Sequence, residues 1–169
     1  MIISHMGIPL QEIIEASTYY NNIGAHAEAV ELLDYVMEHG APYSSTPMQH
    51  EAVEPFTASP LLNYMAGYYT HLSGDVSKSV SYYKKAAAMS SDYCFPSRIE
   101  EQRMLEDAIK MNPSDYKAHY YLGNLLYFYE QKDAAIEQWK ESVALYPKFG
   151  IALRNLGFAT DKHIGDKAM

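Results

Sequence analysis

Part of the chain repeats itself after thirty-four residues, and this period limits the fold more than any other feature. The pair Leu122-Gly123 recurs as Leu156-Gly157, and Pro113 lies the same thirty-four residues before Pro147. Between these landmarks the apolar residues follow helical spacing in two successive stretches. A period of this length with two helical stretches predicts pairs of antiparallel helices that stack on one another.

The small residues of the repeat have a physical purpose. Gly123 and Ala135 let two helix axes approach closely, while Leu122 and Trp139 fill the space beside them. Pro147 can open the following helix but cannot lie inside one. We therefore expect Gly123 and Ala135 to face the seam of one helical hairpin.

These positions resemble the tetratricopeptide repeat (TPR) family, in which large, small, aromatic and proline residues recur at fixed offsets. The matching residues here are His119, Leu122, Gly123, Leu126, Ala135, Trp139 and Pro147. The resemblance implies an all-α fold of antiparallel helical hairpins stacked as a right-handed superhelix. Two positions depart from the pattern, since His119 replaces the usual tryptophan and Glu130 stands in a turn where glycine is common. A non-glycine residue at positive φ costs about 1 kcal/mol, so we expect this turn to use another geometry.

We predict one TPR-like domain over residues 1–169. Its parts are hairpins at about 9–39, 60–90 and 114–146, an extra helix at about 97–111, a partial hairpin at 148–169 and a long loop at 40–59. In the second hairpin Gly74 is expected to end one helix and Asp75 to cap the next. The prolines within 40–59 argue against a helix there and indicate an exposed connector, with a functional loop as the alternative.

The last hairpin holds a first helix, at about Phe149–Asp161, and lacks a second one. Its apolar stripe, which includes Leu153 and Phe158, would be left uncovered. Segments around Asp92–Arg98 and Ala118–Tyr127 also resemble the repeat region of large bacterial proteins, in which a β-rich domain with a mutarotase-like fold precedes the repeats. We expect either a fragment of a longer protein or a homodimer through the open C-terminal helix.

Charge and composition exclude several classes of partner. A net charge of −8 disfavours nucleic acid and anionic membranes. No apolar run approaches the roughly 20 residues that cross a bilayer. The single cysteine, Cys94, rules out an internal disulfide and suits the cytoplasm, and we expect it to be a packing residue.

The sequence lacks signatures of catalysis. Its seven histidines include no pair three to five residues apart, as a zinc site on a helix requires. There is no nucleophile elbow, phosphate-binding loop or dinucleotide fingerprint. We predict a protein that is not an enzyme and that has no cofactor and no metal site.

A ligand groove is predicted on the concave side, which the first helix of each hairpin lines. Helical spacing places one stripe of residues beside the inward-facing positions of these helices. The predicted groove residues are Tyr64, Tyr68, His71, Lys117, Tyr120, Asn124, Tyr127, Arg154, Asn155 and Phe158. Tyrosine combines a large contact area with one hydrogen bond, which suits peptide recognition. The alternative is that this stripe, in a chain with 16 tyrosines, completes the packing between helices.

Some TPR proteins hold the C-terminal carboxylate of a chaperone with lysine, asparagine and arginine side chains. Asn124 and Asn155 occupy matching places here, with Lys117 and Arg154 nearby, but Tyr120 stands where a lysine would be needed. The leading hypothesis is therefore a scaffold that binds a peptide or protein segment, including the rest of its own parent chain. The alternative is an accessory repeat module of a carbohydrate-active enzyme whose catalytic domain lies outside this chain.

Overall fold

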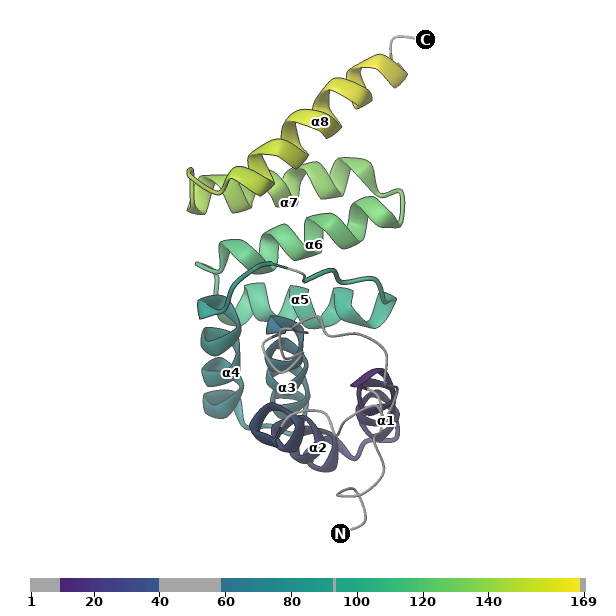
Figure 1. Ribbon diagram of the computed structural model, residues 1–169, viewed down its shortest axis with the longest axis vertical. Helices are drawn as coiled ribbons and strands as arrows, with labels where there is room; N and C mark the ends of the chain where they lie inside the picture. Colours follow the sequence, from purple (N-terminus) through teal and green to yellow (C-terminus); the bar gives the residue numbers. More distant parts are fainter. Residues whose placement is uncertain (1–9, 40–58, 93, 168–169) are drawn as a thin grey trace, which may run out of the picture. The chain divides into compact units, whose positions relative to one another are not determined.

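The computed structural model describes residues 10–39, 59–92 and 94–167, and all regular structure in these ranges is helical (Figure 1). The eight helices are α1 (Leu10–Asn22), α2 (His26–His39), α3 (Pro60–Leu72), α4 (Val76–Ala88), α5 (Ile99–Met111), α6 (Tyr116–Phe128), α7 (Lys132–Leu145) and α8 (Gly150–Lys167). The predicted all-α class with antiparallel helical hairpins is confirmed. The predicted loop at 40–59 lies outside the described residues except for Ser59. None of the described helices has the length and apolar character that a membrane span needs.

The chain divides into two compact units, residues 1–90 with α1 to α4 and residues 91–169 with α5 to α8. Each unit has a buried core of its own. The single domain and the continuous superhelix expected from the repeat remain predictions.

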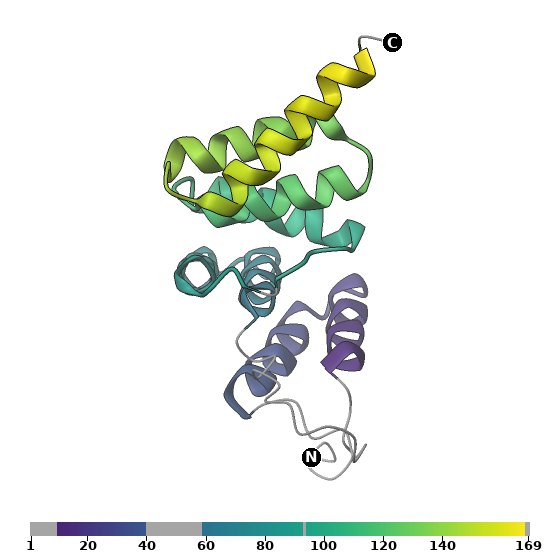
Figure 2. The same cartoon turned by 45° about the horizontal axis from the view of Figure 1, so that its top comes forward.

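In the first unit two antiparallel hairpins, α1 with α2 and α3 with α4, pack through α2 and α3 (Figure 2). Leu33, Leu62 and Tyr83 are fully buried in this core. Gly67 of α3 lies directly against the ring of Tyr83, since a Cβ at Gly67 would stand 2.6 Å from Cε1. A glycine here is what lets α3 and α4 approach so closely.

The second unit repeats this arrangement in the α6–α7 hairpin, with α5 packed on α6 and α8 on α7. A Cβ at Gly123 would stand 2.5 Å from Cδ1 of Trp139, and Ala135 is fully buried. The prediction that Gly123 and Ala135 face a hairpin seam is confirmed. The extra helix also has a partner, because α5 covers the side of α6 away from α7 (Figure 1).

The three hairpin turns share one backbone geometry. Gly24, Gly74 and Glu130 have φ values of 85°, 95° and 59°. In each turn two consecutive amides close the helix, as when Glu130 N–H donates to Tyr127 O at 3.1 Å and Gln131 N–H donates to Leu126 O at 2.9 Å. The expectation that the turn at Glu130 uses another geometry is wrong. The capping hydrogen bonds hold Glu130 in the left-handed region despite its side chain.

Helix starts follow local capping chemistry. Asp75 Oδ1 accepts from Lys78 N–H at 2.9 Å, as predicted, and Asp115 caps α6 by accepting from the backbone amides of Lys117 and Ala118.

At α8 the helix continues six residues past the predicted end at Asp161. No proline follows Pro147, so nothing in the backbone stops the helix earlier.

Candidate functional site

The side chains of α6, α7 and α8 meet in a small amide network. Trp139 Nε1 donates to Asn124 Oδ1 at 3.1 Å, and Asn155 Nδ2 donates to the same oxygen at 3.0 Å. Because an indole N–H is only a donor, the oxygen of Asn124 must face Trp139. This in turn requires Asn155 to present its nitrogen to Asn124, so both amides have a defined orientation.

The fixed orientation leaves one donor group and one acceptor group available. Asn124 Nδ2 and Asn155 Oδ1 make no hydrogen bond within the described part of the chain, and both residues are half-buried. An NH₂ group beside a carbonyl oxygen complements a peptide unit, which offers one C=O and one N–H.

Aromatic and basic side chains also lie on the same two helices, α6 and α8. Tyr127 is half-buried, with its ring centroid 5.4 Å from that of Trp139. On α8, Arg154 is exposed and Phe158 is 63% exposed. We call these residues the α6–α8 face: Asn124, Tyr127, Arg154, Asn155 and Phe158.

Two predicted groove residues of α6 are buried. Tyr120 lies under the start of α8, with its ring centroid 5.1 Å from that of Phe149, and Lys117 places Nζ 5.6 Å from the ring centroid of Tyr116. Tyr146 joins the same cluster, 4.8 Å from Tyr116. In this structure Tyr120 and Lys117 pack between helices, which is the alternative that the sequence left open. In the sequence, only the aromatic residues Tyr146 and Phe149 near Pro147 indicated that Tyr120 and Lys117 would be covered.

The remaining predicted residues belong to the first unit, on α3. Tyr64 is fully buried with its ring centroid 6.4 Å from that of Tyr83, whereas Tyr68 and His71 are half-buried. The structure therefore brings together Asn124 of α6 and Asn155 of α8. Tyr64 has a core position, and Tyr68 and His71 lie in a different unit from the α6–α8 face.

The phenol of Tyr121 and the thiol of Cys94 are buried in the core of the second unit. Burial, followed by the nearby thiol of Cys94, raises the pKa of Tyr121 far above its ordinary value. Cys94 itself is a buried thiol, as predicted for a packing residue. Among the described residues no group of three or more His, Cys, Asp or Glu side chains is arranged to hold a metal ion.

A cleft between α2, α3 and α4 of the first unit was not predicted from the sequence. Its residues are far apart in the chain and follow no motif, so only their packing reveals it.

No protein-family model matches the chain. No curated protein matches it either. Among solved structures, a crystal structure of MamA is 18% identical with a TM-score of 0.39, covering 90% of this chain and 67% of its own.

Two further structures are similar at the same level. Residues 41 to the end of MamA from Desulfovibrio magneticus RS-1 are 19% identical with a TM-score of 0.37, covering 94% of this chain and 87% of that one. YrrB, described as a TPR protein with an unusual peptide-binding site, is 14% identical with a TM-score of 0.33, covering 85% and 72%. Likenesses of this strength do not assign the chain to a family, and its helical-hairpin fold rests on the helix pairs described above.

Proposed function

We propose that this chain is a non-catalytic protein-interaction scaffold that binds an extended peptide segment on the α6–α8 face. The observation that carries the proposal is the oriented amide pair Asn124 and Asn155, which leaves the Asn124 NH₂ group and the Asn155 carbonyl oxygen available to a ligand. Trp139 holds this pair in place before a ligand arrives, so little conformational entropy is lost on binding.

The surroundings of the pair suit a peptide. Tyr127 and Phe158 offer aromatic surface with few rotatable bonds, a property of residues that dominate binding energy. Arg154 adds a guanidinium that pairs with carboxylates in bidentate fashion. The bound segment comes from a partner protein or from a longer parent chain.

Selection of random peptides on the immobilised chain, followed by calorimetric titration of the selected peptides, tests this function. Asn155→Ala removes the acceptor and we expect it to weaken binding roughly two- to tenfold, the contribution of one hydrogen bond. Arg154→Ala should weaken peptides that carry a carboxylate. The matched control is Arg103→Ala, an exposed arginine on α5 outside the face, which should bind as the unchanged chain does. Equal affinity in all three variants would exclude the α6–α8 face.

A C-terminal carboxylate is one specific ligand for Arg154. Comparing an acidic peptide with a free C-terminus and the same peptide with an amidated C-terminus isolates this group. The free form should bind more tightly, and Arg154→Ala and Asn124→Ala should remove the difference. Binding that ignores the terminus would restrict the site to internal peptide segments.

The competing function, an accessory module of a carbohydrate-active enzyme, predicts a different ligand for the same aromatic surface. Sugars stack on tyrosine rings and bond to amides, so a glycan array measures it directly. Glycan binding that Tyr127→Ala abolishes, together with failure of the peptide selection, would favour that function.

A further inference from the structure

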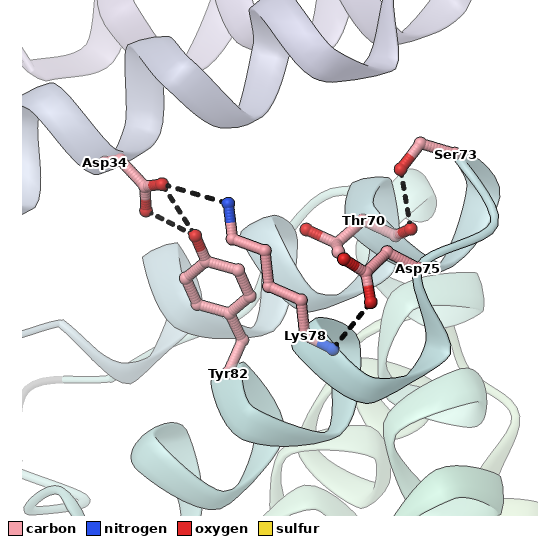
Figure 3. Close-up of polar contacts among 6 residues, drawn as sticks. All are labelled: Asp34, Thr70, Ser73, Asp75, Lys78 and Tyr82. Atoms are coloured by element: carbon pink, nitrogen blue, oxygen red, sulfur yellow. Dashed lines mark hydrogen bonds and ion pairs between the residues drawn. The ribbon is translucent and has the colours of Figure 1, made fainter.

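A cleft of about 340 Å³ opens in the first unit, between α2, the end of α3 and the start of α4 (Figure 3). Its polar lining comes from Glu31, Asp34, Thr70, Ser73, Asp75 and Lys78. The cleft shares no residue with the α6–α8 face, so its role is independent of the function proposed for that face.

Asp34 is held rigidly at one wall of the cleft. Tyr82 Oη donates to both of its carboxylate oxygens at 2.6 Å, and Lys78 Nζ lies 3.6 Å from Oδ2 (Figure 3). Burial, then the hydrogen bond with Asp34 and the charge of its carboxylate, raises the pKa of Tyr82 well above its ordinary value. Tyr82 therefore stays protonated and keeps donating to Asp34 at neutral pH.

Thr70 supplies a buried hydroxyl that no group of the described chain satisfies. The residue is 3% exposed, and Oγ1 has no hydrogen-bond partner among the described residues. Thr18 and Thr160, also in helices, donate instead to the carbonyl four residues earlier, both at 2.8 Å. Figure 3 shows the Thr70 hydroxyl turned away from Ser73, toward the side where Lys78 and Asp34 lie. Buried polar atoms without a partner are rare enough to require a reason.

The polar lining is rich in acceptors. The lining contains three carboxylates, Glu31, Asp34 and Asp75, and one ammonium, Lys78, a local charge of −2. Asp75 Oδ1 accepts from a backbone amide of α4, which leaves Oδ2 without a hydrogen bond among the described residues. Ser73 Oγ donates its hydrogen to Thr70 O at 2.7 Å, so toward a ligand this hydroxyl can only accept. Such a lining fits a group that has only donors, a guanidinium or an ammonium.

We propose that this cleft binds the cationic head of a lysine or arginine side chain from a partner polypeptide. Ala27 and Val30 form the apolar part of the wall, where the methylene stem of such a side chain lies. Lys78 and Asp34 are 50% and 41% exposed in their side chains, so the head enters from solvent while the partner backbone stays on the surface. The ammonium of Lys78 already pairs with Asp34 and therefore competes with the incoming cation for this carboxylate.

The test uses the whole chain and two acetylated, amidated probes, Gly-Arg-Gly-Arg-Gly and the same peptide with citrulline in place of arginine. Citrulline keeps the shape of arginine and removes its charge. Calorimetry measures affinity, and amide shifts of Thr70, Ser73 and Lys78 in NMR spectra locate the peptide. We expect the arginine peptide to bind with shifts at these three residues and the citrulline peptide to bind at least about tenfold more weakly, the loss of one charge-assisted pair.

Four variants of the chain and one control test which residues of the cleft bind the arginine peptide. Glu31→Gln and Asp34→Asn should each weaken binding of the arginine peptide, and Thr70→Val should weaken it roughly two- to tenfold, as the loss of one hydrogen bond does. Lys78→Ala removes the competing cation and should tighten binding up to roughly fivefold, within the range of an exposed ion pair. The control is Glu38→Gln, an exposed carboxylate of α2 outside the lining, which should bind as the unchanged chain does. Circular dichroism checks that each variant is folded, and Thr70→Val keeps the test valid if Asp34→Asn unfolds.

Three outcomes would exclude a cation-binding site in the cleft. They are no binding of the arginine peptide at millimolar concentration, equal binding of the citrulline peptide, and equal weakening by Glu38→Gln. A parallel titration with spermidine separates the source of the cation. If spermidine binds more tightly than the peptide with the same dependence on Thr70 and Glu31, the cleft is a site for free amines and the assignment to a polypeptide side chain is wrong.

Discussion

Gly123 and Gly157 hold the same place in the thirty-four-residue repeat but have different surroundings. A Cβ at Gly123 would lie 2.5 Å from the indole of Trp139, whereas nothing lies within 4 Å of a Cβ at Gly157. A repeat position therefore tolerates a side chain only where no second helix covers it.

This difference predicts opposite effects for the same substitution. Gly123→Ala should lower the free energy of unfolding by about 1–3 kcal/mol, because the new methyl group overpacks the seam. Gly157→Ala should raise it by up to about 1 kcal/mol, since alanine loses less backbone entropy in a helix. Urea denaturation followed by circular dichroism measures both. A Gly123→Ala variant as stable as the unchanged chain would show that Trp139 can move aside.

Glu130 gives a second prediction at the level of single residues. Its φ of 59° is strained for a side chain, so Glu130→Gly should raise the free energy of unfolding by up to about 1 kcal/mol. Glu130→Gln keeps the strain and loses only the exposed contact with Lys132 at 3.4 Å, and we expect it to change stability by a few tenths of a kcal/mol. If both variants gain equally, charge and not backbone strain is the cause.

Between helices, the clearest polar contact is the hydrogen bond that Tyr82 of α4 donates to Asp34 of α2. These helices belong to different hairpins, so the bond fixes how one hairpin sits on the next within the first unit. Burial and Asp34 raise the pKa of Tyr82 above the ordinary value of 10.0. Because the pKa of Tyr82 is raised in the folded state, the hydrogen bond contributes its full stability below about pH 10. This contribution to the free energy of unfolding is lost as the pH rises further.

The substitution Tyr82→Phe tests the hydrogen bond between Tyr82 and Asp34. At pH 7 we expect the variant to unfold about 1–3 kcal/mol more easily, as for other hydrogen bonds to charged groups. The difference from the unchanged chain should shrink as the pH rises above 10, because only the unchanged chain has a phenol to ionise at this position. Denaturation at several pH values measures it, with Tyr19→Phe, an exposed tyrosine of α1, as the matched control. A difference that stays constant with pH would contradict the assignment.

For the whole molecule, the exposed apolar side chains of α8 bear on the oligomeric state. Leu153 is 43% exposed and Phe158 63% exposed, and burying such apolar side chains against a second copy would favour association. The homodimer expected from the sequence therefore remains a prediction, with α8 as its interface.

Light scattering after size-exclusion chromatography tests whether the chain forms this homodimer. The 19.1 kDa chain should show a mass that rises toward twice this value with concentration, and Phe158→Ser should keep it monomeric. Phe95→Ser is the matched control, because Phe95 is 70% exposed but lies outside α8, and it should leave the association unchanged. A monomer at every concentration would leave the α6–α8 face free for a peptide and remove the dimer.

The sequence by itself determined the helices and their pairing. Turn glycines and the Asp75 cap are local signals that act within a few residues of where they lie in the chain, and the thirty-four-residue spacing indicates that the pair of helices recurs. The close approach of Gly123 to Trp139 also followed from the sequence, because small and aromatic residues at fixed offsets meet only in a hairpin seam.

Tertiary packing decided which side chains are available to a ligand. Tyr64 and Tyr120 have the spacing of groove residues, yet Tyr83 and Phe149 cover them from other parts of the chain. The orientation of Asn124 and Asn155 depends on Trp139, and the cleft at Thr70 depends on a helix more than thirty residues away in the chain. Helical spacing describes one helix at a time, whereas exposure and hydrogen bonding depend on how neighbouring helices cross.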